Sequence, residues 1–225
     1  MNADAKAGPG ALPRRRFAVG FSGGSGSVYG LRLVEVLLEL GHDVHLVATG
    51  AAVRVLVHEA GATLDLAAPD LASLFPVSLR QRLVVHDLAA VEAAPASGSA
   101  GIAAVILCPC SMGTLARVAH GFSSNLVERM ADVALKEGRP LLVVPRETPL
   151  SELHLENLLK LARLGAIVLP AMPGFYHRPA TVQDLVDFVV GKILDRLGLE
   201  HSLVRRWQTP KPPPHASPWH EGEDG

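Results

Sequence analysis

A stretch rich in glycine and serine, GFSGGSGSVYG at positions 20–30, is the first segment of this 225-residue sequence that could do chemistry. Glycine lets backbone N–H groups approach a phosphate closely, and the N-terminus of a following helix favours negative charge. The spacing G-x-x-G-G-x-G differs from the G-x-G-x-x-G fingerprint of dinucleotide sites. The second predicted strand also ends in Thr49 rather than in an acid that would grip a ribose. The loop therefore favours a mononucleotide over NAD.

A second turn of this kind, CSMGT at positions 110–114, also precedes a predicted helix, and its hydroxyls can bind a phosphate or a ring edge. Cys108 and Cys110 are the only cysteines, and thiols at a strand end are more often small buried apolar groups than nucleophiles. In VPRETP, Arg146 can grip a phosphate with two donors, and the adjacent Glu147 can move a proton.

Three further residues carry charge or a hydroxyl in suggestive positions. Arg129 and Lys136 are seven residues apart, which places them two turns apart on one helix face. By itself, such a pair is more simply interpreted as an exposed salt-bridged surface. Tyr176 stands between prolines in MPGFYHRP, where it can serve either for packing or as a ligand group. The sequence has no H-E-x-x-H, no Cys/His quartet and no Asp cluster, so no metal site is predicted.

Strands and helices alternate along the chain. Strands are predicted at 16–21, 43–48, 82–86, 103–108, 140–145 and 166–170, and helices at 28–40, 50–60, 113–119, 124–137, 149–164 and 181–197. Thr148 and Pro149 form a start signal for the fifth helix, and Thr181 with Asp184 forms a capping box for the sixth. Unbroken apolar runs such as AVILC suit strands buried on both faces. We therefore expect one α/β domain with a single doubly wound, mostly parallel sheet, helices on both faces, and a ligand site at the carboxyl ends of its strands.

Composition limits the class of protein. Hydrophobic residues make up 48% of the chain, and 21 Lys+Arg balance 22 Asp+Glu, so neither nucleic acid nor a membrane surface is an expected partner. The start of the sequence lacks the apolar segment of a signal peptide, and no apolar run is long enough to span a bilayer. We expect a cytoplasmic protein. Residues 1–15 and the Pro-rich residues 209–225 are predicted to be disordered tails.

Four strings, found in order over residues 16–198, resemble the flavin prenyltransferase family of the UbiX/Pad1 type. They are GFSGGSGSVYGLRL, CPCSMGTLARVAHG, ERMADVALKEGRPLLVVPRETPLSELHLENLLKLARLGAIVLPAMPGFYHRP and DLVDFVVGKILDRLGL. The resemblance implies a Rossmann- or flavodoxin-like homododecamer that binds reduced FMN and dimethylallyl phosphate. It implies transfer of the dimethylallyl group to N5 and C6 of the flavin without a metal, giving prenylated FMN for UbiD-type decarboxylases.

The resemblance also assigns residues to roles. It implies FMN contacts at Gly23, Gly24, Ser25, Thr49, Ser111, Met112, Gly113, Thr114 and Arg146. It implies prenyl-phosphate contacts at Arg129, Lys136, Arg146, Tyr176 and Lys192. It implies proton handling by Ser22 and Glu147, and an aromatic cover by Trp207 within a segment, 199–208, that closes over the site. The sequence departs from the family pattern at Gly24, Thr49 and Gly113, where Ala, Ser and Lys are common.

Two other functions are compatible with this pattern. A cysteine decarboxylase of the phosphopantothenoylcysteine type shares the fold and the FMN site, but its P-x-M-N-x-x-M motif is absent, because PAMPGFYHRP contains no Asn. A non-catalytic FMN carrier is the second alternative. A carrier has no need of Arg129, Lys136, Arg146, Glu147 and Tyr176 together.

Overall fold

Six parallel strands form one sheet in this protein, whose computed structural model describes residues 13–204. The strands are β1 (Arg16–Phe21), β2 (Asp43–Ala48), β3 (Leu83–Val85), β4 (Ile102–Cys110), β5 (Leu141–Pro145) and β6 (Ile167–Val168). Their order is β3-β2-β1-β4-β5-β6, and every neighbouring pair is parallel. This is the order of a Rossmann sheet. The prediction of a single doubly wound α/β sheet is confirmed, and the sheet of the described residues is entirely parallel.

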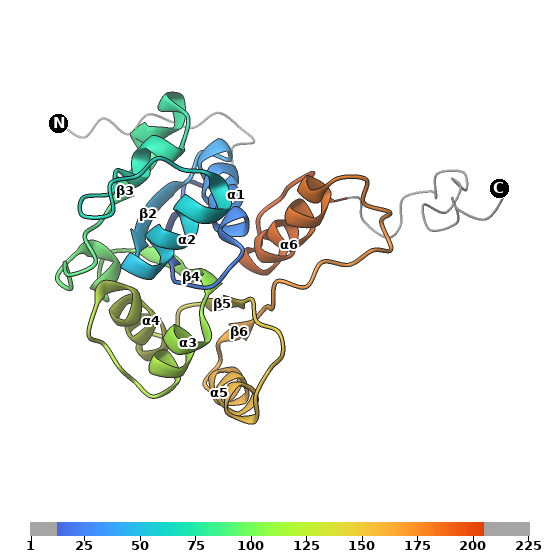
Figure 1. Cartoon of the computed structure of the whole chain (residues 1–225). Coiled ribbons are helices and arrows are strands. Elements are labelled where there is room, and N and C mark those ends of the chain that lie inside the picture. Colours follow the sequence, from blue (N-terminus) through green and yellow to red (C-terminus); the bar gives the residue numbers. More distant parts are fainter. Residues whose placement is uncertain (1–12, 205–225) are drawn as a thin grey trace, which may run out of the picture.

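Within residues 13–204, six helices cover the two faces of the sheet (Figure 1). They are α1 (Ser27–Glu39), α2 (Gly50–Ala60), α3 (Met112–Ala119), α4 (Leu126–Lys136), α5 (Glu152–Arg163) and α6 (Val182–Leu197). Side chains of α1, α2 and α6 pack in one apolar cluster, and side chains of α3, α4 and α5 pack in the other. Short 3₁₀ turns, Leu71–Leu74, Val77–Arg82 and Ala94–Ala96, lie in the connections that flank β3.

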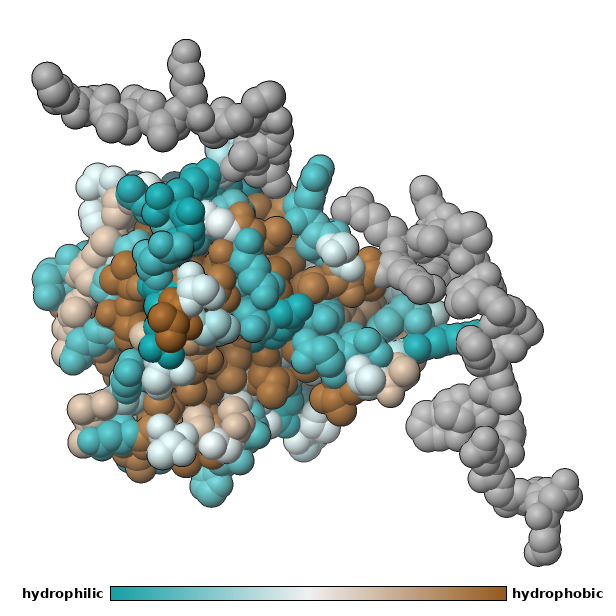
Figure 2. Space-filling view, turned by 90° about the horizontal axis from the view of Figure 1, so that it is seen from above, coloured by the Kyte–Doolittle hydropathy of each residue, from teal (hydrophilic) through white to brown (hydrophobic). Residues whose placement is uncertain are grey.

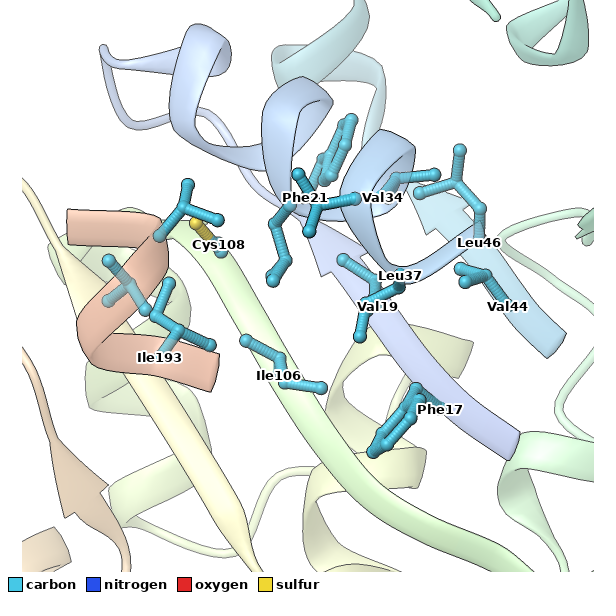
Figure 3. Close-up of a cluster of buried hydrophobic side chains, with 14 of the residues drawn as sticks. Phe17, Val19, Phe21, Val34, Leu37, Val44, Leu46, Ile106, Cys108 and Ile193 are labelled. Atoms are coloured by element: carbon cyan, nitrogen blue, oxygen red, sulfur yellow. The ribbon is translucent and has the colours of Figure 1, made fainter. Parts of the chain in front are cut away.

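The core follows from the alternation of side chains along β1. Phe17, Val19 and Phe21 face α1 and α6, whereas Ala18 belongs to the cluster on the opposite face. Figure 3 shows Phe17, Val19 and Phe21 beside side chains from β2, β4 and α6. These three residues of β1 are each at most 1% exposed. Apolar residues buried on both faces are what a fully parallel sheet requires.

One glycine sets how closely α1 approaches the sheet. A Cβ on Gly30 would lie 2.3 Å from the carbonyl oxygen of Cys108 and 2.6 Å from the Phe21 ring. Any side chain there would push α1 away from β1 and β4, and with it the loop that opens the helix.

Helix α5 begins later than predicted, and the prediction that Thr148 caps it is wrong. The cap is Ser151, whose hydroxyl accepts from the N–H of His154 at 3.3 Å, while His154 Nδ1 accepts from the N–H of Ser151 at 3.3 Å. This reciprocal pair satisfies two backbone donors, and the helix starts at Glu152. The capping box of Thr181 and Asp184 on α6 is confirmed.

The ends of the domain also differ from the prediction. The sequence predicts a disordered tail over residues 1–15, but Arg14 forms a bidentate ion pair with Asp43, and Arg15 donates to the carbonyl of Leu197 at 2.9 Å. The predicted strand 166–170 is short, since only Ile167 and Val168 pair with β5 as a strand. The predictions for residues 1–12 and 205–225 lie outside the described residues.

The surface combines polar and apolar areas. Figure 2 shows apolar side chains reaching solvent across the centre of one face, between polar ones. Among the described residues, no helix has the length and apolar character needed to cross a membrane.

Candidate functional site

The carboxyl ends of β1 and β4 meet where the strand order reverses, the usual ligand position of this fold. Ser22 joins the two ends. It is completely buried, its hydroxyl donates to the carbonyl of Pro109 at 3.1 Å, and it accepts from the N–H of Ser111 at 2.7 Å. Ser22 therefore connects the loop that follows β1 to the loop that follows β4 through two hydrogen bonds. Its hydroxyl proton is donated to the Pro109 carbonyl here, and the proton-handling role implied for Ser22 stays a prediction.

Two glycines allow the first loop to lie against its neighbours. A Cβ on Gly23 would lie 2.7 Å from the Cβ of Ala51, and a Cβ on Gly24 would lie 3.3 Å from the backbone nitrogen of Ser111. The first distance is a clash with a methyl group that cannot rotate away, whereas the second is a tight contact. The loop is thus held against the start of α2 and the start of α3.

The N-terminus of α1 already binds an anion, the carboxylate of Glu59 from α2. One oxygen of Glu59 accepts from the N–H of Gly26, the N–H of Ser27 and the hydroxyl of Ser27, each at 2.8 to 2.9 Å. Burial raises the pKa of this carboxyl, but hydrogen bonds from Ser25, Ser27 and Gly26 outweigh burial, and the net pKa is lowered. Glu59 occupies the position that a glycine-rich loop normally offers to a phosphate.

Two other helix N-termini lie at the same edge of the sheet. Thr49 caps α2 by accepting from the N–H of Ala52 at 3.1 Å, and Ser111 caps α3 by accepting from the N–H of Thr114 at 3.3 Å. The first-turn N–H groups of a helix have no acceptor within the helix. At α2 they belong to Gly50 and Ala51, both of which are exposed. The start of α2 therefore has exposed N–H donors of the kind that bind a phosphate.

The first two residues of α3 differ in exposure to solvent. Met112 is 6% exposed and belongs to the core. Gly113 is exposed, and a Cβ at this position would meet no atom within 4 Å. The lysine that is common at position 113 in the resembling family would therefore fit here without a clash.

Arg146 and Glu147 follow β5 at the same edge. The Nε of Arg146 donates to the carbonyl of Ser25 at 3.3 Å, which brings this guanidinium to the first loop. The carboxylate of Glu147 accepts from the N–H of Thr148 at 3.1 Å. Nearby, burial raises the pKa of the Tyr29 hydroxyl, the Cys108 thiol raises it further, and Arg146 lowers it. The two residues thus place one cation and one carboxylate beside the loop.

Both cysteines are core residues. Cys108 and Cys110 are completely buried on opposite faces of the sheet. Burial raises the pKa of the Cys108 thiol far above its ordinary value and that of Cys110 to about 12. Thiols of this kind are not thiolates at neutral pH, which agrees with the interpretation of both cysteines as small apolar groups.

Arg129 and Lys136 lie on α4, which runs from the carboxyl edge of the sheet to its amino edge before β5 begins. The ammonium of Lys136 pairs with the carboxylate of Glu137 at 2.9 Å. That carboxylate lies 2.8 Å from the position that a Cβ on Gly98 would take, and Gly98 shortly precedes β4, so Lys136 lies at the amino edge of the sheet. The nine residues of β4, whose length is about 26 Å at the usual rise per residue, separate this end from Ser111. Lys136 and Arg146 of one subunit therefore cannot hold the same phosphate.

Tyr176 and Lys192 form a third cluster, beside β6 and α6. The Tyr176 ring meets the Phe188 ring edge-on at 5.6 Å, and the ammonium of Lys192 lies 5.5 Å from the centroid of the same ring. A cavity of about 460 Å³ opens here and is lined by Leu169, Pro170, Met172, Phe188, Val189, Lys192, Asp195 and Arg196. Its two cations outnumber its one carboxylate, and its walls are largely apolar, so the cavity suits a small anion that has an apolar part. Trp207, predicted to cover the site, lies outside the described residues.

Comparisons with known proteins agree with the resemblance seen in the sequence. A family model described as Flavoprotein matches residues 6–194. The flavin prenyltransferase UbiX of Alkalihalophilus pseudofirmus is 51% identical over 189 residues, which cover 84% of this chain and 94% of the relative. The chain belongs to the flavin prenyltransferase family.

Two solved structures place the fold in the same family. A crystal structure of AnUbiX (PadA1) in complex with FMN and dimethylallyl pyrophosphate has a TM-score of 0.77 and 36% identity, covering 88% of this chain and all of that chain. A dodecameric FMN-dependent UbiX-like decarboxylase from Escherichia coli O157:H7 has a TM-score of 0.76 and 40% identity, covering 86% of this chain and all of that chain.

In this flavin prenyltransferase family member, the residues predicted for the site form three clusters in one subunit. The largest cluster lies at the carboxyl edge and contains Ser22, Gly23, Gly24, Ser25, Thr49, Ser111, Met112, Gly113, Thr114, Arg146 and Glu147. The second is the pair on α4, and the third surrounds Phe188. Within the described residues, no group of three or more His, Cys, Asp or Glu side chains could hold a metal ion.

Sequence reasoning missed Glu59, because this residue is 33 positions from the loop whose N–H groups it binds. No spacing rule connects a carboxylate near the end of one helix with the start of the preceding helix. The only available signal is the lack of an acidic residue in the first turn of α1, which leaves its N-terminus to be satisfied from elsewhere.

Proposed function

We propose that the protein transfers a dimethylallyl group from dimethylallyl phosphate to N5 and C6 of reduced FMN, and that prenylated FMN is its product. The observation that carries the proposal is the 36% identity, over the full length of that chain, to a protein crystallised with FMN and dimethylallyl pyrophosphate. The three clusters supply the groups that this chemistry needs. We place the protein in the cytoplasm, where reduced flavin is available.

The FMN site is proposed at the carboxyl edge of the sheet. Gly23 and Gly24 give a loop without side chains against which a flat ring can lie, and the start of α2 receives the phosphate. Ser25, Thr49 and the residues Ser111–Thr114 contribute hydroxyl and backbone donors around it. Since Glu59 occupies the start of α1, its carboxylate shapes the loop and repels a phosphate from that helix.

The cations of the site stabilise the departing phosphate. When the bond between the allylic carbon and oxygen breaks, the phosphate leaves with the electron pair and its negative charge increases. Arg129, Lys136, Arg146 and Lys192 are proposed to bind that charge, which fixed cations in a dry site do more effectively than water. The Phe188 ring and the apolar walls of the cavity exclude water from the allyl cation.

Glu147 is proposed as the group that moves protons at the flavin, since it is the carboxylate that directly follows Arg146 at the carboxyl edge. Tyr176 is proposed to donate to the prenyl phosphate from the edge of the cavity. Ser22, which joins the two loops through its two hydrogen bonds, is proposed to take part in this proton handling beside Glu147. Trp207 is proposed to cover the site, together with residues 199–208.

A complete site is proposed to require neighbouring subunits. Lys136 and Arg146 of one chain are separated by the length of the sheet, so the two cations can meet at one phosphate only if different copies provide them. The dodecameric assembly of the relative from Escherichia coli O157:H7 supports a closed homo-oligomer, and we propose a dodecamer for this chain.

The recipient of the product is proposed to be a UbiD-type decarboxylase, and this provides the test. The protein is incubated with reduced FMN and dimethylallyl phosphate or diphosphate, without metal, and the protein-free filtrate is added to an apo-decarboxylase of that type. We expect the filtrate to activate the decarboxylase, and a filtrate made with FMN alone to fail. Equal activation by both filtrates would contradict the proposal and favour the FMN carrier.

A further inference from the structure

The last described residues of the chain dock on α6 at a glycine. A Cβ on Gly191 would lie 2.9 Å from Cε1 of His201 and 2.9 Å from Cγ2 of Val204. The His201 side chain is only 5% exposed, although it follows the last helix in a short connection. The absent side chain at position 191 thus creates a slot, and the segment 199–204 occupies it.

Hydrogen bonds in this slot fix the orientation of His201. The N–H of Leu203 donates to Nδ1 of His201 at 3.3 Å, so Nδ1 is an acceptor and the neutral ring carries its hydrogen on Nε2. That Nε2–H points at Asp195, whose Oδ1 accepts at 3.2 Å. The other carboxylate oxygen, Oδ2, lies 4.0 Å from the ammonium of Lys192. A continuous chain of contacts therefore leads from the C-terminal segment to Lys192.

Lys192 and Asp195 both line the cavity of about 460 Å³. The distance of 4.0 Å between them is the outer limit of an ion pair, and both side chains are almost half exposed. The ammonium therefore keeps the capacity to bind a second anion in the cavity. Asp195 is the carboxylate that competes with such an anion, and how strongly it competes depends on what else holds it.

We propose that His201 and Asp195 are positioning residues that keep Lys192 available for the prenyl phosphate. The proposal rests on the function proposed above for Lys192. His201 holds one oxygen of Asp195 and so keeps the carboxylate at the edge of the pair. Losing that donor strengthens the pairing of the carboxylate with Lys192, which lowers the affinity of the ammonium for a phosphate in the cavity. Docking of the segment 199–204 thereby sets the affinity for the substrate.

The test measures binding without turnover. Protein loaded with oxidised FMN is titrated with dimethylallyl phosphate in a calorimeter. Lys192→Met is expected to raise Kd about tenfold, as for a lost charge-assisted contact, and His201→Leu about fivefold. His201→Gln, whose amide can donate to Asp195 and accept from Leu203, is expected to stay within about twofold of the parent.

The Asp195→Asn background separates positioning from a general loss of structure. An Asn at this position cannot neutralise Lys192, so adding His201→Leu to Asp195→Asn is expected to leave Kd unchanged. A fivefold rise in that background would overturn the proposal, because the effect of His201 would then not pass through the carboxylate. FMN affinity serves as the control and is expected to be equal for His201→Leu and His201→Gln.

Different results would contradict the role proposed for Lys192 and the role inferred for His201 and Asp195. If Lys192→Met leaves Kd unchanged, the role proposed for Lys192 is wrong, and the positioning of Lys192 falls with it. If Lys192→Met raises Kd but His201→Leu does not, only the inference about His201 and Asp195 is wrong, and the proposed function stands.

Discussion

Subunits of this protein should complement one another when they carry different defects. Lys136 lies at the amino edge of the sheet and Arg146 at the carboxyl edge, separated by the length of β4. If both cations act on one phosphate, they come from different copies. Lys136→Met and Arg146→Met are each expected to lower kcat/KM about a hundredfold, the usual effect of removing one stabilising donor from a charged transition state.

The proposed geometry fixes the fraction of intact sites in a mixed oligomer. In a random one-to-one mixture, half of the subunits carry an intact Arg146 and the other half carry an intact Lys136. A site that takes one residue from each of two neighbours is fully intact in about a quarter of cases, since the two choices are independent in a closed assembly. Coexpressed variants with two different tags, purified over both, should therefore recover about a quarter of the parent activity.

A matched control uses two residues from the same helix. Arg129 and Lys136 both lie on α4, so a mixture of Arg129→Met with Lys136→Met has no fully intact site. This mixture should stay at the level of the single variants. The reasoning is refuted if the mixture of Lys136→Met with Arg146→Met also stays at that level, because the two cations would then act within one subunit.

Three further outcomes follow from contacts in the fold. Gly23→Ala, which places a methyl group 2.7 Å from that of Ala51, should abolish FMN binding in a fluorescence titration, whereas Gly24→Ala, with 3.3 Å to a backbone atom, should keep it. Glu128→Gln should lower the free energy of unfolding in urea by about 2 kcal/mol at pH 7, because the buried carboxylate bonds a half-exposed arginine. Burial raises the pKa of Glu128, but hydrogen bonds from that arginine and the neighbouring turn outweigh burial, and the net pKa is lowered. The difference in stability should therefore shrink as the pH falls below the ordinary pKa of a glutamate. Cys110, with a pKa raised to about 12, should resist iodoacetamide in the folded protein at pH 8 and react only in urea.

The fold could be predicted because its signals are local. Apolar runs such as AVILC mark strands buried on both faces, and the capping box of Thr181 and Asp184 marks the start of α6. The start of α5 was missed because Thr148 and Ser151 are both suitable caps three residues apart. Only the reciprocal hydrogen bonds of His154 decide between them.

The site could be predicted only in part, because some of its contacts join residues far apart in sequence. The carboxyl ends of the strands gave the position of Arg146 and Glu147, since a parallel sheet gathers those ends at one edge. The bond from Glu59 to the first loop and the docking of His201 on Gly191 are tertiary contacts with no sequence pattern. The position of Lys136 was available in principle, since a residue just before a parallel strand lies at the amino edge.

The central claim is that this protein prenylates a flavin, and the mass of the flavin it releases tests that claim most directly. Purified protein is incubated anaerobically with reduced FMN and dimethylallyl phosphate, without metal, and the flavin is released and measured by mass spectrometry. We expect a flavin heavier by one C5H8 unit, and no such flavin in a reaction that lacks the prenyl donor. Bound but unmodified FMN, with both the phosphate and the diphosphate donor, would contradict that claim.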